Sequence, residues 1–341
     1  MNNTFSIIIP FQETNSYVID CINLCLELDY DEKKYDIFLL PDNELRKEEL
    51  LKEIKESNRR RFNGIVIIHP TGLVTPGIKR NIAMKQSKAD YFACIDSDAY
   101  PDKDWLKNAL EVLQYKEIGI VGGPNRIPKK TTGLERLAIS VLYLNVMAKG
   151  LYTAKKFKDK GYEYTLMASS NFIIKKDVAK EAGYFDEEYY PGEDAILSYN
   201  VLDKGYKIIY SPDVIVYHHR RPLFWKHLKK MKETAESTSS VLKQFKKHRR
   251  ISHFLPSIFT GIIVLCIIFG FVNSAFFIGL GICLVIYFLI LICDSVINEI
   301  YNPLEIILVT LGAFLTHLFY GYGFIKGLIK KSKKLKTIVY C

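Results

Sequence analysis

The sequence predicts an α/β fold with a mostly parallel sheet, followed by C-terminal segments that face a membrane. Through roughly residue 125, short apolar runs alternate with stretches of helical pattern, which is typical of βαβ units. Two acidic clusters occur in this part and in the strand pattern that follows it. Beyond residue 250 the chain changes to long apolar segments beside Lys and Arg, which is typical of a membrane domain.

Seven short apolar runs are expected to form strands. They are Phe5–Ile9, Asp36–Leu40, Gly64–Ile68, Tyr91–Ile95, Ile118–Val121, Asn171–Ile174 and Lys207–Tyr210. The helices expected between them are Tyr17–Leu28, Glu44–Glu56, Lys79–Lys88, Trp105–Leu113, Leu134–Ala148 and a helix from Ala195. Gly122 and Gly123 are expected to close the fifth strand, and residues 126–165 are otherwise basic and irregular.

The length suits one large domain with an appendage. The predicted parts are an α/β domain, a basic amphipathic juxtamembrane segment, a membrane domain of two or three helices and a basic cytoplasmic tail. Their boundaries are 1–221, 222–253, 254–329 and 330–341.

The charge is divided unevenly along the chain. Residues 1–220 carry 31 Lys and Arg against 32 Asp and Glu, whereas residues 221–341 carry 16 against 5. The basic excess therefore lies beside the apolar segments, as in a membrane protein with cytoplasmic flanks. A nucleic-acid binder would instead need a basic groove in the folded domain, so no nucleic-acid partner is expected.

The cysteines indicate a reducing, cytosolic setting for the soluble part. The seven Cys show no metal-binding spacing, and Cys21 and Cys25 share one face of a predicted helix as core thiols. No cleavable signal sequence is expected, because Phe5–Pro10 is too short for an apolar signal core and no positive charge precedes it.

Residues Pro222–Arg250 form a basic stretch with scattered apolar residues, which suits a helix on an anionic membrane surface. A solvated helix is the alternative. Three apolar segments follow, near residues 254–272, 275–293 and 304–325. The first two are long enough to span and form a hairpin, whereas the third contains Glu305 and His317.

The basic clusters leave the number of spans open. Lys243–Arg250 and Lys330–Lys336 are both expected on the cytoplasmic side, which requires an even number of spans. Either the third segment is re-entrant or interfacial, or the charge rule fails. The expected location is the cell membrane, as a multi-pass protein with three membrane-embedded segments, an open number of true spans and the α/β domain in the cytoplasm.

The first acidic cluster is Asp96-Ser97-Asp98, which follows the predicted strand Tyr91–Ile95. Carboxylates at the end of a parallel strand lie on the rim where open α/β sheets bind ligands. Mg²⁺ or Mn²⁺ bridging a diphosphate needs one or two such oxygens from the protein. The alternative is a turn with a helix cap, since Asp bonds its neighbouring backbone.

The second cluster, Gly192-Glu193-Asp194, lies in a loop rich in Tyr and Pro. It supplies a further carboxylate for general-base work, although Glu-Asp before an apolar stretch is also a helix start signal. Metal, diphosphate and base together indicate sugar transfer from a nucleotide.

Five motifs, in their order and spacing, resemble the family 2 glycosyltransferases with the GT-A fold, over roughly residues 4–225. Ile7–Pro10 with Glu13 looks like that family's opening strand and loop. Asp42 matches its acidic position after the second strand, which holds the nucleotide base. Gly77–Asn81 before Asp96–Asp98 is similar to its "ARN … DSD" stretch, with "WL" at Trp105-Leu106. Gly192–Asp194 looks like its ED motif, and His218 matches a histidine that completes the metal site in many members.

The chain departs from the family pattern in three loops. Gln12 replaces the usual Asn, Pro41–Glu44 replaces Asp-Asp-Gly-Ser, and Ala168–Asn171 replaces a glycine-rich loop. The Gln-x-x-Arg-Trp motif of processive synthases is absent, which favours single-sugar addition.

The resemblance implies a Rossmann-like GT-A catalytic domain and an inverting hexosyltransferase that uses Mn²⁺ or Mg²⁺. Asp194 is the expected general base and Glu193 positions the loop or the acceptor. The metal ligands are expected to be Asp98, Asp96 and His218. The residues expected to bind the nucleotide-diphosphate sugar are Pro10, Glu13, Asp42, Lys79, Arg80, Asn81 and Asp96.

A membrane anchor raises the effective concentration of a lipid-linked acceptor. The acceptor is therefore expected to be membrane-associated and polyprenyl-linked, in polysaccharide or glycan assembly. One alternative resembles dolichol-phosphate mannose synthase, in which the acceptor is the lipid phosphate itself. Another is a non-catalytic membrane scaffold with a degenerate transferase domain.

Overall fold

A computed structural model describes residues 2–44, 50, 54, 62, 64–144 and 155–330. The chain forms two compact units, and each is described by itself. The first unit contains the described residues up to 128 together with residues 155–219. The second contains residues 129–144 and 220–330. The second unit thus includes a segment that precedes the last third of the first.

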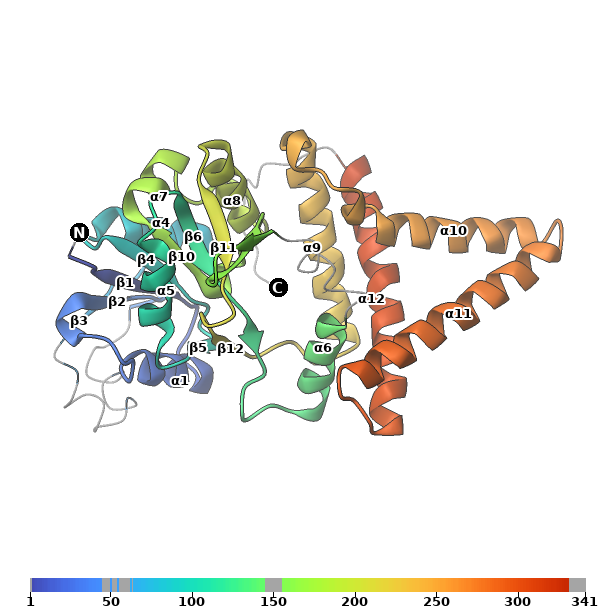
Figure 1. The fold of residues 1–341 in the computed structure, drawn as a ribbon, viewed down its shortest axis with the longest axis horizontal. Coiled ribbons are helices and arrows are strands. Elements are labelled where there is room, and N and C mark those ends of the chain that lie inside the picture. Colours follow the sequence, from blue (N-terminus) through green and yellow to red (C-terminus); the bar gives the residue numbers. More distant parts are fainter. Residues whose placement is uncertain are drawn as a thin grey trace. The chain divides into compact units, whose positions relative to one another are not determined.

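The centre of the first unit is a nine-stranded sheet (Figure 1). Its strands, in spatial order, are β3 (Ile65–Ile68), β2 (Tyr35–Leu40), β1 (Phe5–Pro10), β4 (Tyr91–Cys94), β10 (Phe172–Lys175), β6 (Ile118–Gly122), β11 (Lys207–Tyr210), β9 (Gly161–Tyr164) and β8 (Lys156–Phe157). β3, β2, β1 and β4 pair in parallel, as do β6 and β11, whereas β10 runs antiparallel between β4 and β6. The predicted mostly parallel α/β fold is confirmed, with a strand at each of the seven predicted runs.

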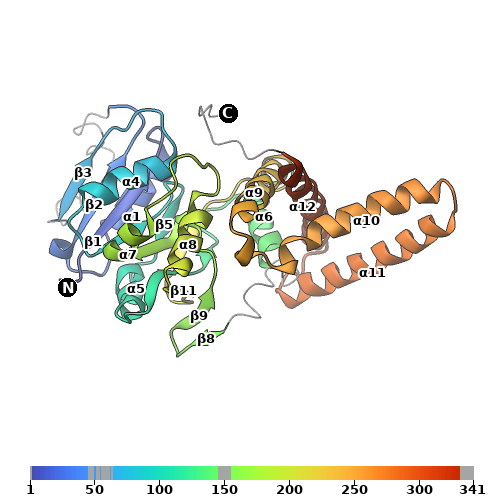
Figure 2. The same ribbon diagram turned by 90° about the horizontal axis from the view of Figure 1, so that it is seen from above.

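Helices cover both faces of this sheet (Figures 1 and 2). On β1, Ile7 and Ile9 pack with α1 (Ser16–Cys25) and α5 (Trp105–Leu113). Ile8 points to the opposite face, since side chains alternate along a strand. It packs in a second cluster with residues of the helices listed here: α4 (Pro76–Gln86), α7 (Lys176–Ala182) and α8 (Glu193–Asp203). The helix predicted at Glu44–Glu56 lies outside the described residues, apart from residues 44, 50 and 54.

A second sheet of three short strands was not predicted. β12 (Val216–His218) lies between β5 (Ala99–Pro101) and β7 (Asn125–Arg126). Strands of two or three residues are too short to show an alternating pattern in a sequence. Their pairing matters because it places His218 opposite Ala99, next to the first acidic cluster.

The second unit consists of helices. These are α6 (Gly133–Tyr143), α9 (Trp225–Gln244), α10 (Leu255–Gly270), α11 (Ala275–Ile297) and α12 (Pro303–Ile329). α9 and α12 lie side by side, and α10 and α11 form a hairpin that projects away from them (Figures 1 and 2). A small apolar core joins α6, α11, α12 and Leu223.

Two helices, α11 and α12, are long and apolar enough to cross a membrane. α10 has only 16 residues. At about 1.5 Å per residue it is shorter than a hydrocarbon core of about 30 Å. The prediction that the first apolar segment is long enough to span is therefore wrong for its helical part, because the chain turns after Gly270. α12 has 27 residues and exceeds the predicted third segment.

Candidate active site

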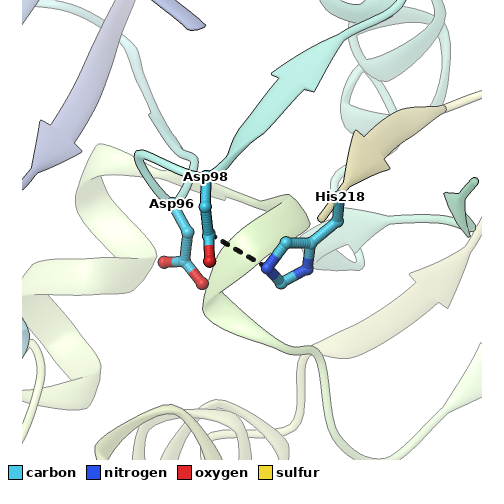
Figure 3. Close-up of side chains that lie close together, drawn as sticks. All are labelled: Asp96, Asp98 and His218. Carbon is cyan, nitrogen blue, oxygen red and sulfur yellow. Dashed lines mark hydrogen bonds and ion pairs between the residues drawn. The ribbon is translucent and has the colours of Figure 1, made fainter. Parts of the chain in front are cut away.

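The three predicted metal ligands come together at the edge between the two sheets (Figure 3). Asp96 and Asp98 lie in the link from β4 to β5, and His218 ends β12. One ligand atom from each of the three residues lies within 4.8 Å of the others. His218 Nε2 lies 3.1 Å from Asp98 Oδ1. Residues 120 positions apart thus form one cluster.

The two carboxylates of this cluster are the oxygen donors that a hard divalent cation prefers, and the imidazole adds a nitrogen donor. This set of donors suits Mn²⁺ or Mg²⁺. The Asp98 side chain is 52% exposed, whereas the His218 side chain is only 9% exposed. His218 Nδ1 is buried and has no hydrogen-bond partner among the described residues. The exposed carboxylate of Asp98 and the buried imidazole of His218 could therefore both contact a cation bound at the protein surface.

Three consecutive residues of α4 point to three different parts of this site. Lys79, Arg80 and Asn81 are all buried. Lys79 Nζ donates to the carbonyl oxygens of Phe11 at 2.6 Å and Leu40 at 3.0 Å. It also forms an ion pair with Asp42. Burial lowers the pKa of Lys79, and the Asp42 carboxylate opposes that shift. The ends of β1 and β2 are thereby fixed to α4.

Arg80 connects the two acidic clusters. Its Nη2 lies 2.6 Å from Asp96 Oδ1, and its Nη1 lies 3.5 Å from Glu193 Oε1. Its side chain is among the largest fully buried ones in the protein. A buried guanidinium between carboxylates offsets their mutual repulsion, which holds the two clusters close together.

Asn81 fixes the loop before α8. Its Nδ2 donates to the Phe185 carbonyl at 2.8 Å, and its Oδ1 accepts the Phe185 N–H at 3.0 Å. Its Nδ2 also contacts Glu187 Oε1 at 3.0 Å. A side-chain amide that both donates to and accepts from one peptide fixes the position of that loop.

The predicted base and its neighbour begin α8. Gly192 has a φ of 118°, which favours glycine, and its N–H donates to Glu193 Oε2 at 3.0 Å. Glu193 is buried, and burial raises its pKa to about 7. Asp194 accepts hydrogen bonds from the Ser169 N–H at 3.3 Å and the Ala195 N–H at 2.8 Å. Burial also raises the pKa of Asp194, while these two hydrogen bonds oppose the shift.

The remaining predicted donor contacts lie along the ends of β1 and β2. Pro10 ends β1 opposite Leu40, and the Asp42 N–H donates to the Gln12 carbonyl at 3.2 Å. Glu13 is exposed in the same loop. The loops after the two strands are therefore in contact, with Asp42 between them and α4.

Two supporting features escaped the sequence prediction. Trp105 Nε1 donates to Asn171 Oδ1 at 2.9 Å, and Asn171 Nδ2 donates to the Val214 carbonyl at 2.8 Å. These two hydrogen bonds fix the segment that precedes β12. Rings also gather near the metal cluster: Tyr17 lies 4.6 Å from His219, and Tyr100 lies 5.4 Å from Tyr217 between centroids. Apart from the "WL" resemblance at Trp105, no pattern in the sequence indicates these contacts.

The family model for glycosyl transferase family 2 matches residues 6–183, which is more than half of the chain. The chain belongs to glycosyltransferase family 2. This family 2 glycosyltransferase is therefore an enzyme, and it transfers sugars from nucleotide sugars. Asp96 and Asp98 lie within the matched residues, whereas Glu193, Asp194 and His218 follow them.

Two archaeal relatives are themselves named as sugar transferases. It is 24% identical over 343 residues to a dolichyl N-acetyl-α-D-glucosaminyl phosphate 3-β-D-2,3-diacetamido-2,3-dideoxy-β-D-glucuronosyltransferase of Methanococcus voltae, covering 98% of this chain and 100% of the relative. It is 23% identical to glycosyltransferase AglE of Haloferax volcanii, over 66% of this chain and 69% of that protein.

A solved structure supports the GT-A fold. The mannosyltransferase PcManGT from Pyrobaculum calidifontis, in complex with GDP-Man and Mn²⁺, superposes with a TM-score of 0.65. The similarity covers 95% of this chain and 86% of that chain at 14% sequence identity. At this coverage the similarity includes residues of both units of the chain.

Proposed function

We propose that this glycosyltransferase is a metal-dependent, inverting enzyme that adds a single sugar to a polyprenyl-linked acceptor in a membrane. The observation that carries the proposal is the contact of Arg80 with both Asp96 and Glu193. It joins a candidate cation site to the acidic cluster that contains the candidate base, Asp194. Such a pairing suits a reaction in which a nucleoside diphosphate leaves on one side and a hydroxyl attacks from the other.

Asp96, Asp98 and His218 would hold Mn²⁺ or Mg²⁺ against the donor diphosphate. When bound, the cation supplies positive charge for the leaving nucleotide. Asp42, Lys79 and the loop of Pro10 and Glu13 would form the base and ribose side of the donor site. The contacts of Lys79 and Arg80 with carboxylates of the protein support a positioning role for both, with Asp42 and Asp96 facing the donor.

Asp194 is the proposed general base. It lies at the start of α8 and is held by two backbone N–H groups, so its carboxylate has a defined direction. A raised pKa brings the carboxylate nearer to the operating pH, which increases its strength as a base. Deprotonation of the acceptor hydroxyl on the face opposite the leaving group gives inversion at the anomeric carbon.

A membrane acceptor is supported by two observations. The second unit has apolar helices that could place the enzyme in a bilayer. The relative from Methanococcus voltae, matched over its whole length, is named for a dolichyl-phosphate-linked sugar. A tethered enzyme meets such an acceptor at a high effective concentration.

The proposal is tested by a donor screen with detergent-solubilised protein. UDP-, GDP- and dTDP-sugars are incubated with Mn²⁺ or Mg²⁺ and a polyprenyl-linked monosaccharide, and the released nucleoside diphosphate and the glycolipid are measured. We expect release with one donor, inverted configuration in the product, and loss of both with chelator or with Asp98→Ala. Release that persists at full rate in chelator would contradict the metal site. Transfer to polyprenyl phosphate but to no lipid-linked sugar would replace the proposed acceptor.

A further inference from the structure

α12 makes polar contacts with α6 and α9 of its own unit near its start, in its middle and near its end. Near its start, Glu305 forms an ion pair with Arg136 of α6. In its middle, Thr316 Oγ1 lies 3.1 Å from His227 Nε2 of α9. Near its end, Lys326 Nζ lies 2.7 Å from Glu236 Oε1 of α9.

The contact between α9 and α12 is too close for lipid to separate the two helices. A Cβ atom on Gly323 would lie 2.4 Å from the Lys232 carbonyl oxygen. One on Gly327 would lie 2.0 Å from Ser239 Oγ. Glycine at these two positions allows the backbones to meet, as small residues do at packed helix pairs.

α9 cannot enter a hydrocarbon core. It carries seven charged residues among 20, and each costs about 2.5–3.5 kcal/mol at the centre of a bilayer. If α12 crossed the membrane with its partner attached, α9 would have to lie at the same depth. The packing of α12 against α9 therefore opposes insertion of α12 into the hydrocarbon core.

The face of α12 away from α9 is exposed and apolar. It carries Leu304, Ile307, Leu311, Tyr322 and Ile329 at helical spacing. An apolar stripe on one side and polar contacts on the other is typical of a helix that lies in the plane of a membrane interface. Trp225 is also exposed, at the start of the basic helix α9.

The hairpin of α10 and α11 differs from α12 in having no polar face. No Asp, Glu, Lys, Arg or His occurs between His253 and Asp294. Phe271 and Val272 at the tip are 81% and 85% exposed. Basic residues of Lys243–Arg250 directly precede the hairpin, as expected for a segment at an anionic lipid surface.

We infer that only the α10–α11 hairpin enters a lipid bilayer, as a re-entrant hairpin because α10 alone is too short to cross, while α12 and α9 lie together on one bilayer surface. This inference rests on the membrane attachment proposed above. Residues on both sides of the hairpin and at the end of α12 then share one side of the membrane. The basic clusters before α10 and after α12 also share that side, as the positive-inside rule requires.

Cysteine labelling tests this topology. Ser252→Cys, Tyr301→Cys and Lys330→Cys are made singly in the full chain, after Cys266, Cys283, Cys293 and Cys341 are replaced by Ser. The remaining cysteines, Cys21, Cys25 and Cys94, are buried and serve as unreactive background. A membrane-impermeant maleimide is added to intact cells and to inverted membrane vesicles. We expect all three variants to react in the same preparation. Reaction of Tyr301→Cys and Lys330→Cys in opposite preparations would overturn the inference.

A charge substitution gives a second measurement that does not depend on labelling. Leu311→Lys lies on the exposed stripe of α12, and Ile286→Lys lies in the middle of α11. We expect carbonate-washed membranes to retain Leu311→Lys as they retain the unsubstituted protein, because an interfacial lysine can reach water. Retention of Ile286→Lys is expected to fall severalfold. Equal losses would contradict an interfacial α12.

The same fractionation separates the two proposals. If the unsubstituted protein is released from membranes by carbonate, the membrane part of the proposed function fails. If it stays in the membrane but Tyr301→Cys and Lys330→Cys lie on opposite sides, only the topology fails.

Discussion

At the scale of single residues, Arg80 is the side chain on which the proposed site most depends. It is fully buried, and its guanidinium faces carboxylates of two motifs that lie about one hundred residues apart. Removing one partner of a buried charge pair leaves the other uncompensated, which is far more costly than the net value of the pair.

Replacing Arg80 by Met is therefore expected to lower the free energy of unfolding by about 3–5 kcal/mol. Lys85→Met is the matched control on the same helix. Lys85 pairs with Glu187 at 3.2 Å, but their side chains are 56% and 48% exposed, so its loss should cost under about 1 kcal/mol. Denaturant unfolding of the detergent-solubilised protein measures both. A similar loss of unfolding free energy in the two variants would show that burial of Arg80 does not increase its contribution to stability.

Asp194→Asn tests the proposed base. The amide keeps the size of the side chain but cannot take a proton from the acceptor. We expect turnover to fall about 10²–10⁴-fold, with donor affinity changed by less than a factor of about three. Isothermal titration with the nucleoside diphosphate and single-turnover transfer separate the two effects. Parallel loss of binding and turnover would assign Asp194 a structural role.

The raised pKa of Glu193 predicts that the free energy of unfolding depends on pH. Burial raises its pKa to about 7 in the folded state, while the unfolded chain keeps an ordinary value near 4.5. Between these values the folded state holds a proton that the unfolded state releases. The contribution of Glu193 to the free energy of unfolding therefore falls as pH rises from 5 to 8.

The comparison of wild type with Glu193→Gln measures this contribution. We expect the variant to show a flatter dependence of unfolding free energy on pH over that interval. Glu187→Gln serves as control, because Glu187 is exposed and its pKa is lowered by Asn81 and Lys85. Equal slopes for wild type and Glu193→Gln would contradict the raised pKa.

The sequence indicated candidate site residues, but it did not indicate how these residues contact one another. The DSD and ED clusters stand out as acidic groups beside apolar runs. The family resemblance added His218, whose partner Asp98 lies 120 positions away. The Arg80–Glu193 contact and the Trp105–Asn171 bond depend on how distant loops pack, and no local pattern records that.

At the scale of secondary structure, α4 organises the donor side of the site. It begins at a buried cap, in which the Thr75 side chain accepts the Ile78 N–H at 3.3 Å, and Pro76 follows as the first helical residue. The cap sets where Lys79, Arg80 and Asn81 lie along the helix. This is also why α4 begins three residues before its predicted start.

Thr75→Ala is expected to cost about 1 kcal/mol of stability and to weaken donor binding severalfold, because the first turn of α4 loses its cap. Thr132→Ala is the matched control. Thr132 caps α6 in the second unit with a capping box to Glu135, so its loss should have a similar local cost without an effect on donor affinity. Thermal unfolding and donor titration check both. Unchanged donor affinity in Thr75→Ala would show that the cap does not set the site.

Strands of four residues or more were predictable because apolar runs bounded by turns mark them. β5, β7 and β12 have two or three residues each and could not be recognised. The hairpin of β8 and β9 was also not predicted, because β8 has two residues and the four residues of β9, Gly161–Tyr164, do not form an apolar run. α10 was predicted too long, since apolar composition continues through Phe271 and Val272 after the helix has ended.

At the scale of the whole molecule, a nucleotide-sugar-dependent unit and a unit with apolar helices belong to one chain. Composition predicted a division near residue 221, because the charge balance changes there. The structure groups residues 129–144 with the C-terminal helices. Nothing in the composition of that segment marks it as part of the second unit, since its apolar face is short and local.

Because both units belong to one chain, we expect the rate of sugar transfer to depend on whether the acceptor lies in the same membrane as the enzyme. Protein and polyprenyl-linked acceptor reconstituted in the same vesicles should react at least about tenfold faster than protein and acceptor in separate vesicles. The total lipid, acceptor and donor are kept equal in the two mixtures. A detergent that merges the vesicles should remove the difference. Equal initial rates before detergent would indicate an acceptor taken from solution.

The arrangement of Lys79, Arg80 and Asn81 also limits how the enzyme can change its donor. Each of these neighbours serves a different loop, so a substitution in one loop that needs a new partner must be matched by a second substitution on α4. Changes at the exposed loop tips face no such condition. Variants that accept new sugars are therefore expected to carry substitutions at loop tips such as Gln12 and Asn43. Lys79, Arg80 and Asn81 are expected to stay unchanged together.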